Sequence, residues 1–160
     1  MSDTLVHVTN APRPEAAYEL LSERYRVVTR DEGSTARLAE TGSDRINVWG
    51  SDAALRLALD APDAIEALIL EAPAAPADLD RLAGLNVPTL VVYGTRDTVT
   101  APATGRVYRQ TLPNCNYVLV YNAGHEIAVD RPEAFVSLVA DFLERREAFI
   151  VTQKSSLLHP

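Results

Sequence analysis

The sequence predicts an α/β protein built on a doubly wound, mainly parallel sheet of six strands with helices on both faces. Short apolar runs rich in β-branched residues recur along the 160 residues, and segments with helical periodicity separate them. No internal repeat, low-complexity tract or linker interrupts this alternation. We therefore expect one domain over residues 1–148, followed by a tail over residues 149–160.

The six predicted strands share β-branched and aromatic composition and cover residues 4–9, 25–29, 45–49, 65–70, 89–93 and 117–121. Pro12 and Pro14 open the first predicted helix, whose Ala17, Leu20 and Leu21 share one face. Further helices are predicted over residues 35–40, 52–61, 77–82 and 102–112, and Asp130 caps a closing helix. That closing helix has a clear apolar stripe, formed by Phe135, Leu138, Val139, Phe142 and Leu143. Residues 149–152 look strand-like, and we assign the tail no role.

Composition narrows the class of protein. An apolar content of 47% with 23% charged residues is ordinary for a globular domain. The net charge of −7 argues against a nucleic-acid or anionic membrane partner, which would need clustered Lys and Arg. The single cysteine, Cys115, excludes an internal disulfide, and Met1-Ser2-Asp3 lacks the basic start of a signal peptide. We expect a cytoplasmic protein.

Metal and cofactor chemistry has little support in the sequence. His7, His125 and His159 are far apart and show no metal-ligand spacing. No glycine-rich dinucleotide or phosphate loop is present. We predict neither a metal nor a cofactor, and a small molecule as the substrate.

Two catalytically useful side chains follow neighbouring predicted strands. Asp97 comes three residues after Gly94, which ends one strand, and His125 follows the next strand. In open α/β sheets ligands bind at the carboxyl ends of the strands. A carboxylate that holds one imidazole nitrogen leaves the other nitrogen free to accept a proton.

From residue 45 to residue 143 the chain resembles the core of the α/β-hydrolase family. The resemblance is carried by Asn47-Val48-Trp49-Gly50 with Ala54 to Ala58, by Ala67 to Leu70, by Pro88 to Asp97, and by Gly124-His125 with Arg131 to Phe135. In that family the catalytic acid follows one strand and the histidine follows the next. The resemblance implies that Asp97 is the acid and His125 the base.

The nucleophile is open to three readings. The family places it in Gly-x-Nuc-x-Gly, a sharp turn from strand to helix with small residues on both sides. If Ser51 is the nucleophile, Trp49 stands where a small residue is expected; if it is Asp52, Gly50 and Ala54 have the right spacing. In the third reading Ser51 or Asp52 is only the N-cap of the next helix.

The oxyanion hole also departs from the family. Val8-Thr9-Asn10-Ala11 stands where the family has His-Gly, so Asn10 and the helix start at Asp52 are the candidates for substrate or oxyanion contacts. Compared with the family, the first two strands and the cap are absent. Because this leaves a sheet edge and an active-site face uncovered, we predict a homodimer.

Three functions follow from these observations. The leading one is a capless serine hydrolase that cleaves a small ester or acyl substrate through Ser51, His125 and Asp97. The second is a catalytically decayed member of the fold that serves as a binding or assembly protein. The third is an Asp52-nucleophile hydrolase, similar to haloalkane dehalogenases or epoxide hydrolases.

Overall fold

A seven-stranded sheet forms the centre of the computed structural model, which describes residues 3–33, 45–146, 149 and 157–158. Within that part of the chain the strand order is β2-β1-β3-β4-β5-β6-β7. The strands are β1 (Thr4–Val8), β2 (Arg26–Arg30), β3 (Ile46–Gly50), β4 (Ile65–Glu71), β5 (Thr89–Gly94), β6 (Cys115–Val120) and β7 (Leu157–Leu158). Strands β1 to β6 are parallel, which confirms the predicted six-stranded parallel sheet. The two-residue β7 pairs antiparallel with β6 and lies in the tail, to which we assigned no role from the sequence.

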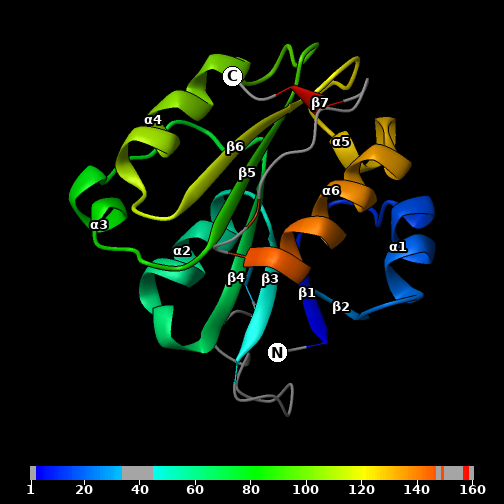
Figure 1. Ribbon diagram of the computed structural model, residues 1–160, viewed down its shortest axis with the longest axis horizontal. Coiled ribbons are helices and arrows are strands. Elements are labelled where there is room, and N and C mark those ends of the chain that lie inside the picture. The colour runs from blue at the N-terminus through cyan, green and yellow to red at the C-terminus, as the bar shows by residue number, and fades with distance from the viewer. Residues whose placement is uncertain (1–2, 34–44, 147–148, 150–156, 159–160) are drawn as a thin grey trace.

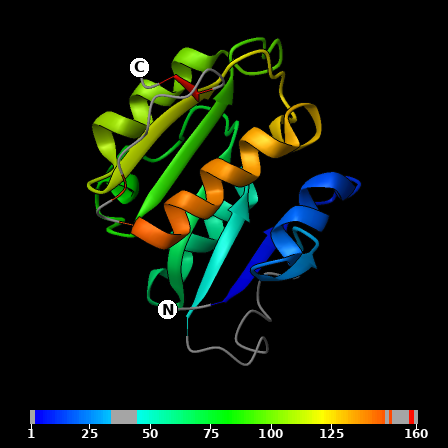
Figure 2. The same cartoon turned by 45° about the vertical axis from the view of Figure 1, so that its right-hand side comes forward.

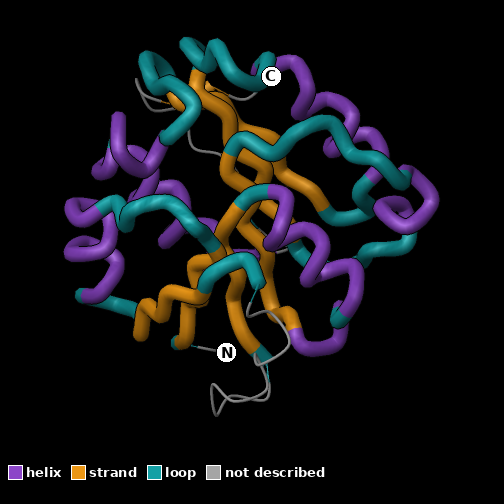
Figure 3. Tube along the Cα trace, turned by 180° about the vertical axis from the view of Figure 1, so that it is seen from behind, coloured by secondary structure: helices purple, strands orange, loops and turns teal. Residues whose placement is uncertain are grey.

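Helices cover both faces of this sheet (Figure 1). They are α1 (Glu15–Ser22), α2 (Asp52–Asp60), α3 (Leu79–Ala83), α4 (Gly105–Thr111), α5 (Ile127–Asp130) and α6 (Pro132–Arg145), with 3₁₀ turns η2 (Pro62–Ala64) and η3 (Pro102–Thr104). One layer contains α1, α5 and α6, and the turned view in Figure 2 shows α6 crossing the sheet diagonally. The opposite layer contains α2, α3 and α4, which Figure 3 shows from behind. Coverage of both faces is the doubly wound arrangement that the sequence predicts.

The central strands are apolar because both of their faces are covered. All residues of β1, β3 and β5 are buried, and the middle of β4 is fully enclosed. The outer strand β2 is only half-buried. This pattern follows from parallel pairing, which buries central strands on two sides and leaves an edge strand with one covered side.

Most element ends differ from the sequence prediction by one or two residues, and two helix starts differ in kind. The predicted helix over residues 102–112 begins as the 3₁₀ turn η3 and becomes α-helical only at Gly105. The predicted cap of the closing helix is wrong, because α6 begins at Pro132 after Arg131. Asp130 instead ends α5, and its Oδ2 accepts a hydrogen bond from the Gly124 N–H at 2.7 Å. That bond fixes the loop that carries His125.

Some expectations lie outside the described residues. These are the helix over residues 35–40, residues 150–152 of the strand-like segment, and His159. Of that segment, Phe149 is described; it is buried and packs edge-on against Phe142, with ring centroids 5.6 Å apart. None of the helices that the structure describes has the length and apolar character needed to span a bilayer.

Candidate active site

Asp97 and His125 meet at the carboxyl edge of the sheet, beyond β5 and β6. The Asp97 Oδ2 and His125 Nδ1 atoms are 2.9 Å apart. The Asp97 side chain is fully buried, whereas that of His125 is 38% exposed. The carboxylate therefore fixes one nitrogen of the imidazole from inside the protein, and the ring stays accessible from outside.

Backbone donors hold Asp97 in place. Its Oδ1 accepts hydrogen bonds from the Val99 and Thr100 N–H groups, both at 2.8 Å. Burial alone would raise the pKa of Asp97, but the hydrogen bonds from Thr100, His125 and Val99 outweigh it and lower that pKa below its ordinary value. Asp97 is therefore an anion at neutral pH, as the acid of a Ser-His-Asp arrangement must be.

Gly94 allows the two loops to approach each other this closely. A Cβ atom on Gly94 would lie 2.2 Å from the Ala123 carbonyl oxygen and 2.3 Å from that of Gly124. Both contacts are with backbone atoms directly before His125. The end of β5 thus packs against the His125 loop only because residue 94 has no side chain.

Ser51 occupies the N-cap position of α2, at the turn that follows β3. Its side chain makes no capping hydrogen bond, so the hydroxyl is not used for the N-cap role that we considered. Gly50, the preceding residue, packs closely against β1 and α2. A Cβ atom at this position would lie 2.8 Å from the Val8 carbonyl oxygen and 2.9 Å from the Ala54 Cβ. Ser51 has a negative φ of −119°.

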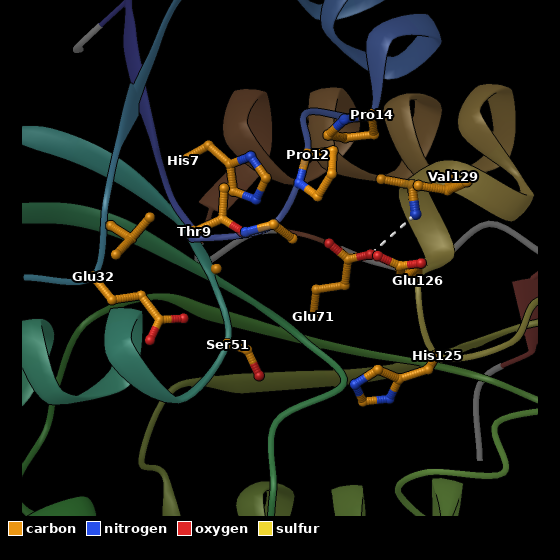
Figure 4. A pocket seen from close by; sticks show the side chains of 14 residues that line it. His7, Thr9, Pro12, Pro14, Glu32, Ser51, Glu71, His125, Glu126 and Val129 are labelled. Carbon is orange, nitrogen blue, oxygen red and sulfur yellow. Dashed lines mark hydrogen bonds between the residues drawn. The ribbon is translucent and has the colours of Figure 1, made fainter.

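Ser51 and His125 both line a cavity of about 230 Å³ (Figure 4). Its walls come from the carboxyl ends of β1, β3 and β4, the loops after β2 and β6, the loop before α1, and the start of α5. The lining residues are His7, Val8, Thr9, Ala11, Pro12, Pro14, Glu32, Gly50, Ser51, Glu71, His125, Glu126, Ala128 and Val129. Within the described part of the chain, no hydrogen bond joins the Ser51 hydroxyl to the His125 ring. Both side chains line this one cavity.

The other two predicted site residues face elsewhere. The Asp52 Oδ1 accepts a hydrogen bond from the Ala74 N–H at 2.9 Å, which ties α2 to the loop after β4. The Asn10 Oδ1 accepts one from the Glu32 N–H at 3.0 Å. Neither Asn10 nor Asp52 lines the cavity.

Two cavity residues were missed by sequence reasoning, namely His7 and Glu71. Glu71 is the last residue of β4, so it obeys the same rule that identified Asp97: a carboxylate where an apolar strand ends. His7 lies within β1, and nothing in its local pattern distinguishes it from a core histidine.

His7 is enclosed by aromatic rings. Its ring stacks on Trp49 with centroids 3.6 Å apart and planes inclined by 5°, and its Nδ1 is 2.8 Å from the Tyr18 hydroxyl. Burial lowers the pKa of His7 to about 3, so this imidazole is neutral at neutral pH.

Among the described residues, the other reactive groups do not form a second site. Burial raises the pKa of the Cys115 thiol to about 12, so it is not a thiolate nucleophile. Among the residues that the structure describes, no three His, Cys, Asp or Glu side chains come together in a way that could hold a metal ion.

Comparison with known proteins gives a consistent set of relatives. The sequence profile of a family described as TAP-like proteins, one of the α/β-hydrolases, matches residues 68–148, just over half of the 160. The pimeloyl-[acyl-carrier protein] methyl ester esterase of Neisseria meningitidis is 33% identical over 95 residues, which is 59% of this chain and 27% of that protein. The 3-oxoadipate enol-lactonase 1 of Acinetobacter baylyi is 32% identical over 65 residues, 41% of this chain and 24% of that protein.

The chain therefore spans only about a quarter of the length of these two curated relatives. Among solved structures, a serine hydrolase from Cycloclasticus zankles superposes with a TM-score of 0.79 at 12% identity, covering 90% of both chains. Similarity at this level of identity supports the fold.

Proposed function

The chain belongs to the α/β-hydrolase family, and we propose that it hydrolyses a small ester or acyl substrate with Ser51 as nucleophile. In this proposal His125 is the general base and acid, and Asp97 orients it. The observation that carries the proposal is the Asp97–His125 hydrogen bond of 2.9 Å beside a cavity that also contains Ser51. The curated relatives, an esterase and a lactonase, support an ester as the substrate class.

The proposed reaction has two steps. The Ser51 oxygen attacks the ester carbonyl carbon while His125 takes the hydroxyl proton, and His125 then gives that proton to the departing alcohol. Water attacks the acyl-serine by the same route, releases the carboxylic acid and restores the serine. The buried anion of Asp97 stabilises the imidazolium that forms in each step.

Two structural features bear on the rate and on the size of the substrate. Asn10 faces away from the cavity, so the backbone N–H groups at the start of α2 are the remaining candidates to stabilise the oxyanion. Loss of one oxyanion donor costs about 10²- to 10³-fold in turnover, so we expect a slow enzyme. A cavity of about 230 Å³ favours short acyl and alkyl groups.

A binding or assembly protein without catalytic activity is the second candidate. Two observations at Ser51 favour this second candidate. Its φ of −119° differs from the strained turn in which the family holds its nucleophile. Within the described residues, no hydrogen bond joins its hydroxyl to His125. The Asp52-nucleophile hydrolase is weaker, because the Asp52 carboxylate accepts a hydrogen bond from Ala74 and does not line the cavity.

Alanine substitution of the acid–base pair tests the leading proposal. His125→Ala and Asp97→Ala should each lower hydrolysis of p-nitrophenyl acetate at least 10³-fold. Asp78→Ala is the matched control, because Asp78 also accepts a backbone hydrogen bond, from the Arg81 N–H, but caps α3 outside the cavity. Unchanged rates in both pair variants would contradict the proposal.

The predicted homodimer and the cytoplasmic location remain predictions. A homodimer would cover a sheet edge or the open face around the cavity. A monomeric mass at micromolar protein concentration, measured by light scattering, would contradict it.

A further inference from the structure

A part-buried carboxylate links the two segments that carry Ser51 and His125. Glu71 ends β4, next to β3 in the sheet, where Leu70 pairs with Gly50. Its side chain reaches the cavity wall between the Ser51 turn and α5 (Figure 4). This position gives Glu71 access to both segments at once.

Each carboxylate oxygen of Glu71 accepts a hydrogen bond from a different segment. Oε1 accepts from the Trp49 indole Nε1–H at 2.8 Å, and Trp49 lies two residues before Ser51. Oε2 accepts from the Ala128 N–H at 3.0 Å, and Ala128 lies three residues after His125. The Ile127 N–H also acts on this carboxylate.

Glu71 has no cationic partner in any ion pair of the described residues. Burial raises the pKa of Glu71, and the nearby Glu126 charge raises it further, although the hydrogen bonds from Ala128, Trp49 and Ile127 oppose this. A carboxylate that is largely removed from water and has no cation beside it is costly for stability. The Glu71 carboxylate has two acceptor oxygens, and each faces an N–H donor. A neutral amide has only one acceptor oxygen, so it cannot accept from both donors.

We propose that Glu71 is a positioning residue that fixes the separation between the Ser51 turn and the His125 loop. The inference rests on the proposed function. Glu71 does not contact the reacting atoms; it holds Trp49 on one side and the start of α5 on the other. A glutamine presents an amide NH₂ to one of these donors, so it keeps only one of the two links.

Glu71→Gln and Glu71→Asp test this role in the full chain. Both should lower kcat for p-nitrophenyl acetate about 10- to 100-fold with little change in KM, because misplacing reacting groups slows chemistry more than binding. Glu133→Gln, at an exposed glutamate of α6 that does not line the cavity, is the control and should leave kcat unchanged. Glu71→Gln in the His125→Ala background should cause no further loss, since Glu71 acts through the placement of His125.

Two readouts do not depend on activity. The chain has one tryptophan, so its single indole N–H proton resonance reports directly on the Trp49–Glu71 bond. In Glu71→Gln this resonance should move upfield, or the amides of residues 127–130 should exchange faster with solvent.

The outcomes separate the two proposals. A wild-type protein without esterase activity refutes the proposed function. In that case the indole resonance and the amide exchange still test whether Glu71 connects Trp49 to the start of α5. An unchanged resonance together with unchanged exchange overturns the role of Glu71. In an active enzyme, an unchanged kcat in both Glu71 variants also overturns this role. The same holds if Glu71→Gln lowers kcat equally in the wild-type and His125→Ala backgrounds.

Discussion

Replacement of His7 by glutamine should remove most of the loss in the free energy of unfolding that we expect between pH 7 and pH 5. In β1, His7 is 6% exposed and pairs in register with Trp49, on which its ring stacks. Protonation would place a charge in this aromatic environment. Glutamine at position 7 stays neutral at every pH and can still bond to the Tyr18 hydroxyl.

The magnitude follows from the pKa of His7, which burial lowers from 6.5 to about 3. Below pH 6.5 the unfolded chain binds a proton that the folded protein does not, so the free energy of unfolding falls as the pH falls, until about pH 3. Below pH 6.5 the slope is about 1.4 kcal/mol per pH unit, so the roughly 1.5 units between pH 6.5 and pH 5 cost about 2 kcal/mol. The Glu71 carboxyl has the opposite sign, since its raised pKa favours the folded state as the pH falls, but both proteins contain it.

The assay is urea unfolding of wild type and His7→Gln at pH 7 and pH 5, followed by circular dichroism. We expect the wild type to lose about 2 kcal/mol more than the variant between these pH values. The comparison cancels all other titrating groups that the two proteins share. An equal loss in both proteins would refute the reasoning, because His7 would then titrate alike in the folded and unfolded states.

Two further substitutions test the geometry of the site. Gly94→Ala should destabilise the fold by at least about 3 kcal/mol in urea unfolding, because its Cβ would lie 2.2 Å from the Ala123 carbonyl oxygen. Gly84→Ala, whose nearest contact would be 3.6 Å, should change stability by less than about 1 kcal/mol, and equal effects would contradict the close approach. Asp52→Asn should keep esterase activity within about threefold, since an asparagine oxygen still accepts from the Ala74 N–H. A complete loss of activity with intact folding would instead favour an aspartate nucleophile.

Periodicity and composition were sufficient to predict the sheet. The central strands are buried on both faces, so each reads as an apolar run, and all six parallel strands were predicted within a few residues. The two-residue β7 could not be predicted, because a strand this short has no periodicity and depends on a neighbour, β6, that is distant in the sequence. The cap of α6 was wrong because Asp130 bonds to Gly124 across a loop.

The candidate site was predictable where a rule of the fold applies. Asp97 and His125 follow neighbouring parallel strands, and the structure brings their side chains to 2.9 Å. Asn10 also follows a strand, but its side chain bonds to the adjacent β2 loop at Glu32, a choice that depends on tertiary packing. Glu71 satisfied the same rule as Asp97, but its meaning depends on Trp49 and α5, which only the folded structure brings together.

The central claim is that Ser51 forms a covalent intermediate with the help of His125. The most direct measurement is labelling with a fluorophosphonate, followed by mass spectrometry of the peptide that contains Ser51. We predict a phosphonyl adduct on Ser51 in the wild type and none in His125→Ala. An unlabelled Ser51 in a wild-type protein that folds normally would contradict the account.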